Sequence, residues 1–370
     1  MPFLTRRRFL ATAAALPVVR FAAAEENKPE WKSKLEAIRV QYKLPALGGA
    51  IVTSAGVQSV AVTGVRKIDS EVVATVDDLW HLGSNTKAMT STLAGVAVEA
   101  GKIKWETSLE EVFRGERGLN RSPLRTATLT HFLSHWSGLP ANPSWPEAAR
   151  AGRDIVSQRA KALEMAIGWR NLPEPGEKHL YSNWGYVIAG HMLEKVMNLP
   201  WEEQMRRAIF TPLGITGAGF GGTGTPGEID QPWPHGEDGK PMPENGAAVD
   251  NLPVLGPAGT VHMSLGDWAK FVAEHLAGAN GRGKLLKAAT YKRLHTATQE
   301  GEPYAFGWLD LERSWGGRVL SHNGSNTMNY SVAWLAPEKD FALLACTNQG
   351  SEDCRKALDD VVGMLIGEVT

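Results

Sequence analysis

The chain has 370 residues, of which 43% are hydrophobic and 21% are charged, a composition typical of a folded protein rather than a disordered one. This length predicts one large domain or two sub-domains that share a cleft. The 39 Lys and Arg residues nearly balance the 40 Asp and Glu residues, and no basic run follows residue 24, so nothing indicates nucleic-acid binding.

Residues 1–24 are typical of an export signal. Three arginines at 6–8 precede an apolar run from about 9 to 19, and three alanines at 22–24 offer a cleavage site. The apolar run is shorter than the roughly 20 residues that span a bilayer, and no later segment is apolar for long enough. We therefore expect export by the twin-arginine route and a mature periplasmic chain from near Glu25, although an ordinary basic N-terminal helix is the alternative. Without the four arginines of this segment, the 39 basic residues fall to 35 against 40 acidic ones, a net charge near −5.

The first half of the remaining chain starts with a helix and two strands. Apolar residues recur at helical spacing over about 29–42, and strand-like runs follow at 47–53 and 58–65. A buried helix then runs from residue 84 to a stop at Gly101. From about 105 to 292 the pattern is mostly helical with long loops.

The second half contains a long loop and then strands. A second buried helix is expected within 177–198, and the Gly- and Pro-rich residues 219–259 predict a long loop of the kind that is often functional. Ser264 is a good N-cap for the next helix. Short strand-like runs and a closing helix then follow, at 306–311, 317–324, 329–336, 341–348 and 353–366.

Strands therefore come from both ends of the chain and helices from its middle. This order predicts an α+β fold, in which one antiparallel sheet flanked by helices is built from both ends and carries an inserted, mostly helical sub-domain. We expect the sheet part to span about 25–83 and 300–370, the helical part to span 84–299, and a cleft to lie between them.

The buried helix opens on Ser84, with Lys87 one turn later. Residues three apart lie on one helix face, so both side chains point into the same space. A hydroxyl in the first turn lies near free backbone N–H groups and the positive end of the helix dipole. A lysine that burial keeps partly neutral can take the proton of that hydroxyl. The pair predicts a serine nucleophile and its base, although most Ser-x-x-Lys pairs are solvated helix surface.

Tyr181 and Asn183 form the only Tyr-x-Asn in the sequence, at the start of the second buried helix. A phenol near an ammonium can hold anionic character and relay a proton, while an amide can orient Lys87 or hold a substrate carbonyl. A helix cap with a core tyrosine is the alternative interpretation of these two residues.

The third candidate is the segment His322-Asn323-Gly324-Ser325, between two strand-like runs. Glycine at a strand edge permits close backbone approach, and the N–H of Ser325 can then face that of Ser84 as a second oxyanion donor. A plain hairpin loop with an exposed histidine is the alternative.

In this order the three motifs resemble those of the serine β-lactamase and penicillin-binding protein superfamily. The resemblance is to the branch with a tyrosine motif, which contains class C β-lactamases, D,D-carboxypeptidases, D-aminopeptidases and related esterases. The segments LSHWSGLP at 133–140, PHGEDGKPMP at 234–243 and LGPAGTVHMSLGDWAKF at 255–271 also resemble this branch. The similarity covers about residues 32–365.

The resemblance implies a β-lactamase/transpeptidase-like fold and a covalent acyl-enzyme on an ester, amide or lactam. Ser84 would attack the carbonyl, and Lys87 and Tyr181 would manage its proton. The amides of Ser84 and Ser325 would hold the oxyanion, and Asn183 would hold Lys87 and the substrate amide. No metal or other cofactor is implied. The expected partner is a small-molecule or peptidoglycan-type substrate, and the oligomeric state stays open.

His322 departs from the lactamase members of the family, which carry a lysine at the start of the third motif. An imidazole with an ordinary pKa is largely neutral at pH 7, so it should bind a substrate carboxylate more weakly. Some peptidase and esterase members of the branch also have histidine there. The departure therefore favours an esterase or a D-amino-acid peptidase over an efficient β-lactamase.

Two other functions were weighed against this one. A non-catalytic penicillin-recognising module that binds cell wall is the alternative, but all three motifs keep side chains competent for catalysis. An α/β-hydrolase would need a Gly-x-Ser-x-Gly elbow, which the sequence lacks.

Cysteines and loop tryptophans leave further questions. Cys346 falls in an apolar strand-like run, which favours two free thiols, Cys346 and Cys354, over a disulfide. Several tryptophans in loops are candidates for an aromatic acyl pocket, although core packing explains each equally well: Trp136, Trp145, Trp184 and Trp233.

Overall fold

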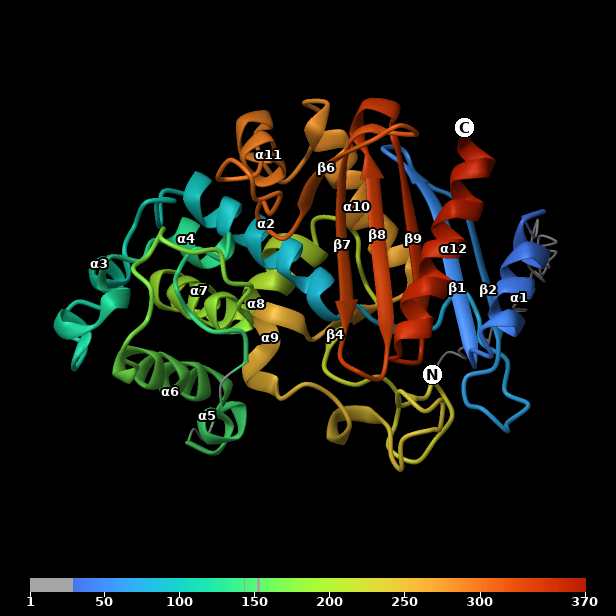
Figure 1. Cartoon of the computed structure of the whole chain (residues 1–370), viewed down its shortest axis with the longest axis horizontal. Coiled ribbons are helices and arrows are strands. Elements are labelled where there is room, and N and C mark those ends of the chain that lie inside the picture. The colour runs from blue at the N-terminus through green and yellow to red at the C-terminus, as the bar shows by residue number, and fades with distance from the viewer. Residues whose placement is uncertain (1–28, 143, 152–153) are drawn as a thin grey trace, which may run out of the picture.

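Both ends of the chain build one antiparallel sheet, on the right of Figure 1. The computed structural model describes residues 29–142, 144–151 and 154–370, so the expected signal at 1–24 lies outside the described residues. The six strands follow the order β2-β1-β9-β8-β7-β6. Their bounds are β1 (Ala46–Thr53), β2 (Gly56–Gly64), β6 (Leu309–Arg313), β7 (Gly317–Ser325), β8 (Tyr330–Ala336) and β9 (Phe341–Thr347).

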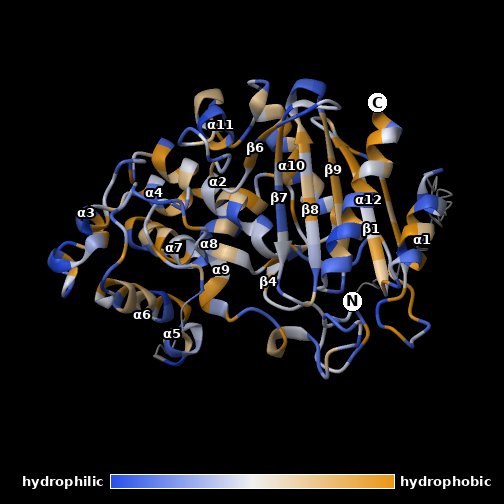
Figure 2. Ribbon diagram, in the orientation of Figure 1, coloured by the Kyte–Doolittle hydropathy of each residue, from blue (hydrophilic) through white to orange (hydrophobic). Residues whose placement is uncertain are grey.

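Both faces of this sheet are buried, which explains the unbroken apolar runs of its central strands. Successive side chains of a strand point to opposite faces. On β9, Leu343 and Ala345 therefore join the core beneath α1 (Lys32–Gln41) and α12 (Glu352–Val369), whereas Ala342 and Leu344 join the second core. Figure 2 shows hydrophobic and hydrophilic residues interspersed along α12, as expected for a helix with one face on a sheet.

The second sheet face packs against helices. The helix α10 (Leu265–Ala279) contacts β1, β2 and β9, although its residues fall within the segment expected to form the helical part. That division of the chain stays a prediction. Most of the remaining helices lie to the left in Figure 1: α2 (Thr86–Glu99), α3 (Leu109–Val112), α4 (Leu129–Leu133), α5 (Trp145–Ala151), α6 (Ile155–Gly168), α7 (Asn183–Met197), α8 (Trp201–Met205), α9 (Gly256–Gly259) and α11 (Ala288–His295).

The observed element order confirms the predicted α+β fold with a sheet from both chain ends. Two signals for helix boundaries, one end and one start, also behave as expected. Gly101 has a φ of +69° directly after the end of α2, and the Ser264 hydroxyl accepts a hydrogen bond from the Asp267 N–H at the start of α10. A small sheet of β3 (Trp80–His81), β5 (Val261–Met263) and β4 (Gly219–Phe220) joins the expected long loop to the segment before Ser84.

The two predicted buried helices both begin later than expected. Ser84 lies in a short 3-10 turn, η1 (Gly83–Asn85), and α2 starts only at Thr86. In the second case, the Ser182 hydroxyl accepts the N–H of Gly185 and caps α7, so the preceding residues are loop. Both nucleophile and tyrosine thus lie just before a helix rather than inside one.

The cysteines lie in different cores. Cys346 of β9 belongs to the core shared with the helical part, whereas Cys354 of α12 belongs to the core on the opposite sheet face. Both are buried and free, which confirms the predicted thiols. Of the helices in the described ranges, none is both long and apolar enough to cross a bilayer.

Candidate active site

Ser84 and Lys87 meet as the helical spacing predicts. The Lys87 side chain is completely buried, and its Nζ lies 2.9 Å from Ser84 Oγ, 2.6 Å from Asn183 Oδ1 and 2.8 Å from the carbonyl oxygen of Ala258. Two of these partners, the Asn183 and Ala258 oxygens, can only accept hydrogen bonds, while the hydroxyl can also donate one. A neutral amine has two N–H donors and one lone pair, so it fits this site with its lone pair directed at Ser84.

Burial also favours the neutral amine. Removal from water lowers the pKa of Lys87 well below its ordinary value. The rings of Tyr181 and Tyr186 lie 4.9 and 5.4 Å from Nζ and oppose this effect by cation–π attraction, which contributes on the order of 1 kcal/mol each. Because Lys87 is completely buried, its amine loses its proton at a lower pH than an exposed lysine does.

Tyr181 lies in the loop immediately before α7 and is positioned by the Ser182 cap. The Ser182 hydroxyl donates to the carbonyl oxygen of Pro140, and the Ser182 N–H donates to His135 Nδ1. The Tyr181 ring packs 4.3 Å from His135 and is partly exposed, and its hydroxyl lies towards Ser84. Burial raises the pKa of this phenol, so the hydroxyl is neutral at pH 7 and lacks the anionic character expected from the sequence.

Two glycines let β7 approach η1. A Cβ on Gly324 would lie 1.9 Å from the carbonyl oxygen of Leu82, and one on Gly83 would lie 2.4 Å from the Ser325 nitrogen. Gly83 also has a φ of +49°, which favours glycine. The close approach brings Ser84 and Ser325 together at a cavity of about 450 Å³ that both residues line.

His322 is a neutral, buried imidazole. Its Nδ1 donates to the carbonyl oxygen of Asn323 at 2.6 Å, which leaves Nε2 to accept from the Tyr304 hydroxyl at 3.3 Å. Burial, reinforced by the charge of nearby Lys87, lowers the pKa of His322 to about 3. The side chain is therefore uncharged at pH 7, in agreement with the sequence-based expectation for an ordinary histidine.

The described lining of the cleft is neutral or acidic. A second cavity of about 320 Å³ adjoins Tyr181 and His322. Among the described residues that line the two cavities there is no lysine or arginine, whereas Asp250 lines the first and Glu302 the second. The electrostatic character of the cleft therefore disfavours an anionic substrate group.

The first cavity also has an apolar wall, which comes from the start of α5 and from residues 252–255. Trp145, Pro146, Leu252 and Leu255 line the first cavity. Trp145 stacks on Trp184 at 4.3 Å, but Trp184 is fully buried beneath it. Trp136 and Trp233 are also buried, and the Trp233 indole donates to the carbonyl oxygen of Met242. Of the four candidate tryptophans, Trp145 is thus the one that lines this cavity.

Several residues of the site were not predicted from the sequence. Asn142 Oδ1 accepts from Asn183 Nδ2 at 2.8 Å, and the Ala258 carbonyl accepts from Lys87. Asp250 and Ala258 fall in the glycine- and proline-rich loop that was expected to be functional, so its composition pointed to the segment but not to the residues. Because every residue has a backbone carbonyl, the residue type does not show which carbonyl contacts Lys87.

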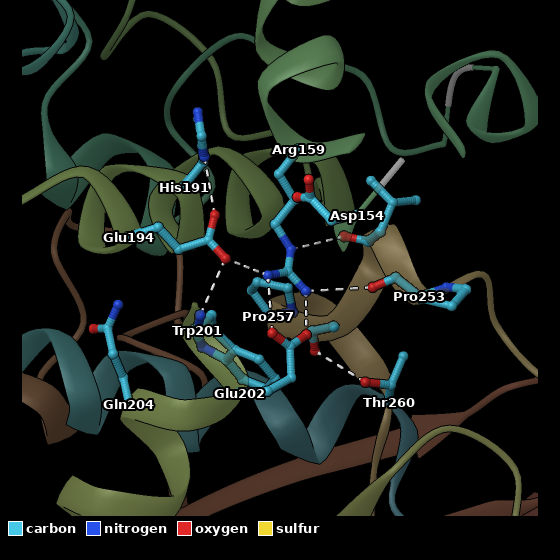
Figure 3. Close-up of polar contacts among 12 residues, drawn as sticks. Asp154, Arg159, His191, Glu194, Trp201, Glu202, Gln204, Pro253, Pro257 and Thr260 are labelled. Atoms are coloured by element: carbon cyan, nitrogen blue, oxygen red, sulfur yellow. Dashed lines mark hydrogen bonds and ion pairs between the residues drawn. The ribbon is translucent and has the colours of Figure 1, made fainter. Parts of the chain in front are cut away.

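A buried ion network holds the loop that carries Ala258. Figure 3 shows Arg159 of α6 between Glu194 of α7 and Glu202 of α8, with which it forms ion pairs. The same guanidinium donates to the carbonyl oxygens of Pro253 and Val254, in the turn η6 (Pro253–Leu255) immediately before α9. Three helices and the segment leading to Ala258 are thereby joined at one side chain.

Comparison with known proteins agrees with this architecture. The sequence model of the Beta-lactamase family matches residues 21–363. Penicillin-binding protein 4 of Amycolatopsis lactamdurans is 26% identical over 365 residues, which cover 92% of this chain and 91% of that protein. A protein of Escherichia coli K12 named "Putative D-alanyl-D-alanine carboxypeptidase" is 26% identical over 303 residues, 74% of this chain but only 65% of the relative.

A solved structure shows the same fold. The class C beta lactamase from Rhodobacter sphaeroides superposes with a TM-score of 0.71 at 18% identity, covering 90% of this chain and 98% of that one. The family match spans nearly all of the described residues, including all three motifs. The chain therefore belongs to the Beta-lactamase family.

Proposed function

We propose that this protein is an exported serine hydrolase that cleaves an ester or amide through a covalent acyl-enzyme formed on Ser84. The observation that carries the proposal is the buried Lys87 amine, which has two obligate acceptors and the Ser84 hydroxyl as its three partners. A serine with such a base beside it is an activated nucleophile.

The proposed reaction begins with attack of Ser84 Oγ on the substrate carbonyl carbon. The hydroxyl proton passes to the Lys87 lone pair, and the carbonyl oxygen becomes an oxyanion that accepts from the N–H groups of Ser84 and Ser325. When the carbon–heteroatom bond breaks, the leaving alcohol or amine takes that proton, with the neutral Tyr181 hydroxyl as a relay. Water then attacks the acyl-enzyme and gives the acid product, with the proton returned to Ser84.

The cleft favours a substrate without a carboxylate beside the reacting bond. His322 is neutral, and no lysine or arginine is among the described residues that line the two cavities. An esterase or D-amino-acid peptidase therefore fits better than an efficient β-lactamase. The wall containing Trp145, Leu252 and Leu255 suits an apolar acyl group. The names of the two relatives support an exported, cell-wall-related enzyme with a peptidoglycan-type substrate. Within such a substrate, the neutral cleft favours a bond that has no free carboxylate beside it.

Intact-mass measurement tests this proposal. Wild type and Ser84→Ala are each exposed to a fluorophosphonate and, separately, to benzylpenicillin. We expect one fluorophosphonate adduct on wild type and none on Ser84→Ala, because the alanine has no nucleophilic oxygen. Ser91→Ala is the matched control, since Ser91 lies on α2, the helix that follows Ser84, and hydrogen-bonds Tyr186 instead. Equal labelling of wild type and Ser84→Ala would refute the nucleophile.

The substrate class is tested with paired nitrophenyl esters that differ only in a neutral or a carboxylate group near the ester. We expect turnover of the neutral ester to exceed that of the anionic ester by at least about tenfold, which corresponds to about 1.4 kcal/mol. A wild-type protein that binds penicillin but neither forms a fluorophosphonate adduct nor turns over any ester would instead be the non-catalytic cell-wall module.

A further inference from the structure

A buried carboxylate outside the three motifs joins two backbone segments. These segments carry Ser84 and Ser325, the proposed oxyanion donors, and we call them the oxyanion wall. The Asp250 side chain is 1% exposed, and its Oδ2 and Oδ1 lie 3.2 and 3.0 Å from His81 Nε2. Asp250 Oδ1 also accepts from Asn326 Nδ2 at 2.7 Å, so both carboxylate oxygens are engaged. His81 lies on β3, three residues before Ser84, and Asn326 directly follows Ser325. One carboxylate thus contacts a neighbour of each proposed oxyanion donor.

The contact with His81 continues to the backbone beside Ser84. The Gly83 N–H donates to His81 Nδ1 at 3.1 Å, so Nδ1 carries a lone pair. The proton of the neutral ring is then on Nε2, which donates it to Asp250. If Nδ1 were protonated, it would face the Gly83 N–H donor to donor. The carboxylate therefore fixes the tautomer that holds the Gly83 peptide, whose next nitrogen is that of Ser84.

The other contact continues to the loop after β7. Asn326 gives its amide NH2 to Asp250, and its Oδ1 accepts from the Met328 N–H and from Asn329 Nδ2, both at 3.2 Å. This arrangement fixes the orientation of the Asn326 amide and the start of the turn. Ser325, the last residue of β7, is thereby held between the strand ladder and this fixed turn.

Stability alone does not explain the contacts of Asp250 with His81 and Asn326. A buried carboxylate is costly unless a cation or several donors compensate it, and neither of these two partners carries a formal charge in the required tautomer. Among the described residues, Asp78 is an equally buried carboxylate, and it is paired with Arg66. The difference indicates that Asp250 serves the geometry of the site.

We propose that Asp250 is a positioning residue that holds the Ser84 and Ser325 amides at the spacing of an oxyanion site, through His81 on one side and Asn326 on the other. The proposal rests on the proposed function, because an oxyanion forms only if Ser84 attacks a carbonyl. Asp250 acts through its two partners and does not itself take the proton of Ser84.

The test exchanges the carboxylate of Asp250 and the amide of Asn326. Asp250→Asn has one acceptor oxygen, so its NH2 group comes within hydrogen-bonding distance of one of two donors, His81 Nε2 or Asn326 Nδ2. In the double variant Asp250→Asn/Asn326→Asp, the new amide accepts from His81 and donates to the new carboxylate. Both connections are then restored with the charge moved by one position.

Single-turnover acylation by a neutral nitrophenyl ester gives the rate constant k2 and the dissociation constant Ks of the ester. We expect Asp250→Asn to lower k2 about 10- to 100-fold, less than the loss of one whole oxyanion donor, with Ks unchanged because the oxyanion exists only in the transition state. The double variant should recover k2 to within about threefold of wild type.

Asp78→Asn is the matched control, because it removes the charge of an equally buried carboxylate outside the site. It should lower the melting temperature and leave k2 unchanged. A merely structural role for Asp250 would lower the melting temperature in the same way and spare k2.

The outcomes separate this inference from the proposed function. If wild type does not acylate at Ser84, the proposed function fails. If wild type acylates and folded Asp250→Asn acylates equally fast, or the folded double variant stays as slow as the single one, the inference alone is wrong. Should either Asp250 variant not fold, Asn326→Ala decides, because it leaves the Asp250–His81 contact in place. An unchanged k2 in that variant overturns the proposal, and a fall of about tenfold with unchanged Ks supports it.

Discussion

At the scale of single residues, the site depends on protonation states that follow from burial. The pKa of Lys87 is lowered, that of Tyr181 is raised and that of His322 is lowered, in each case chiefly because the group is removed from water. Burial thus favours the uncharged form of each of the three side chains. A neutral amine can accept the Ser84 proton, and a neutral phenol can relay it to the leaving group, which are the roles proposed for Lys87 and Tyr181.

The lowered pKa of Lys87 predicts a pH effect on acylation. Because only the neutral amine accepts the Ser84 proton, the rate should rise with pH and level off well below the ordinary lysine pKa of about 10.4. Fluorophosphonate labelling rates across pH 5 to 10 measure this profile. A rate that keeps rising up to pH 10 would mean that the lysine is not depressed, or is not the base.

The same shift predicts a stability effect of defined sign. Between the lowered folded pKa and the ordinary unfolded pKa, the unfolded chain binds the additional proton, so the free energy of unfolding rises with pH. The slope from Lys87 is at most about 1.4 kcal/mol per pH unit. Urea denaturation of wild type and Lys87→Met should show this slope in their difference, and parallel curves would contradict it.

Gly324 gives a steric prediction. A methyl group there would lie 1.9 Å from the Leu82 carbonyl oxygen, so Gly324→Ala must push β7 away from η1. We expect an acylation rate at least about a hundredfold lower, the effect of losing one oxyanion donor. Gly49→Ala on β1 is the matched control, because its added Cβ would meet neighbours at 3.4 Å or more. Nitrophenyl ester kinetics compare the two, and an active Gly324→Ala would contradict the proposed oxyanion wall.

At the scale of elements, Arg159 joins α6, α7, α8 and the turn before α9. The turn is held through its carbonyl oxygens and the helices through two carboxylates, so the position of Ala258 depends on a side chain nearly a hundred residues earlier. This dependence explains how a loop rich in glycine and proline can present a carbonyl to Lys87 in a fixed place.

Arg159→Met should therefore be strongly destabilising. It leaves the Glu194 and Glu202 carboxylates without their buried partner, for which a loss of about 3–5 kcal/mol in the free energy of unfolding is typical. Arg355→Met removes an exposed arginine that pairs with Glu352 and Asp359, and should lower the free energy of unfolding far less, because water screens exposed ion pairs. Chemical denaturation of both variants measures the contrast, and similar losses would contradict it.

At the scale of the whole molecule, sheet and helical parts share one core. The core beneath the second sheet face contains Leu344 of β9 and Leu320 of β7 together with Trp184 of α7 and Leu93 of α2. Although strands and helices are separated in the sequence, both contribute side chains to this core. The chain should unfold as a single cooperative unit.

Thermal unfolding tests this expectation. Far-UV circular dichroism, tryptophan fluorescence and loss of ester hydrolysis should have the same midpoint, because the probes report on one transition. Loss of activity many degrees below the main transition would show that the helical part opens separately.

How much the sequence predicts differs between fold and site. Strand runs buried on both faces, the Gly101 stop and the Ser264 cap are local signals, so they were predicted correctly. The pairing of Ser84 with Lys87 follows from helical spacing. The partners Ala258 and Asp250 were missed, since a carbonyl has no residue signature and an acid in a loop is ordinary until its contacts are known. The neutral Tyr181 was missed because its burial is tertiary.

The position of β9 has a consequence for the timing of synthesis. This strand is the last of the sheet in the chain, yet it lies between β1 and β8. A nascent polypeptide that lacks its final segment holds only two separate strand groups, β1–β2 and β6–β7–β8, with nothing to link them. The two strand groups can therefore join only after β9 has been synthesised, and we expect chains truncated before β9 to have no hydrolytic activity.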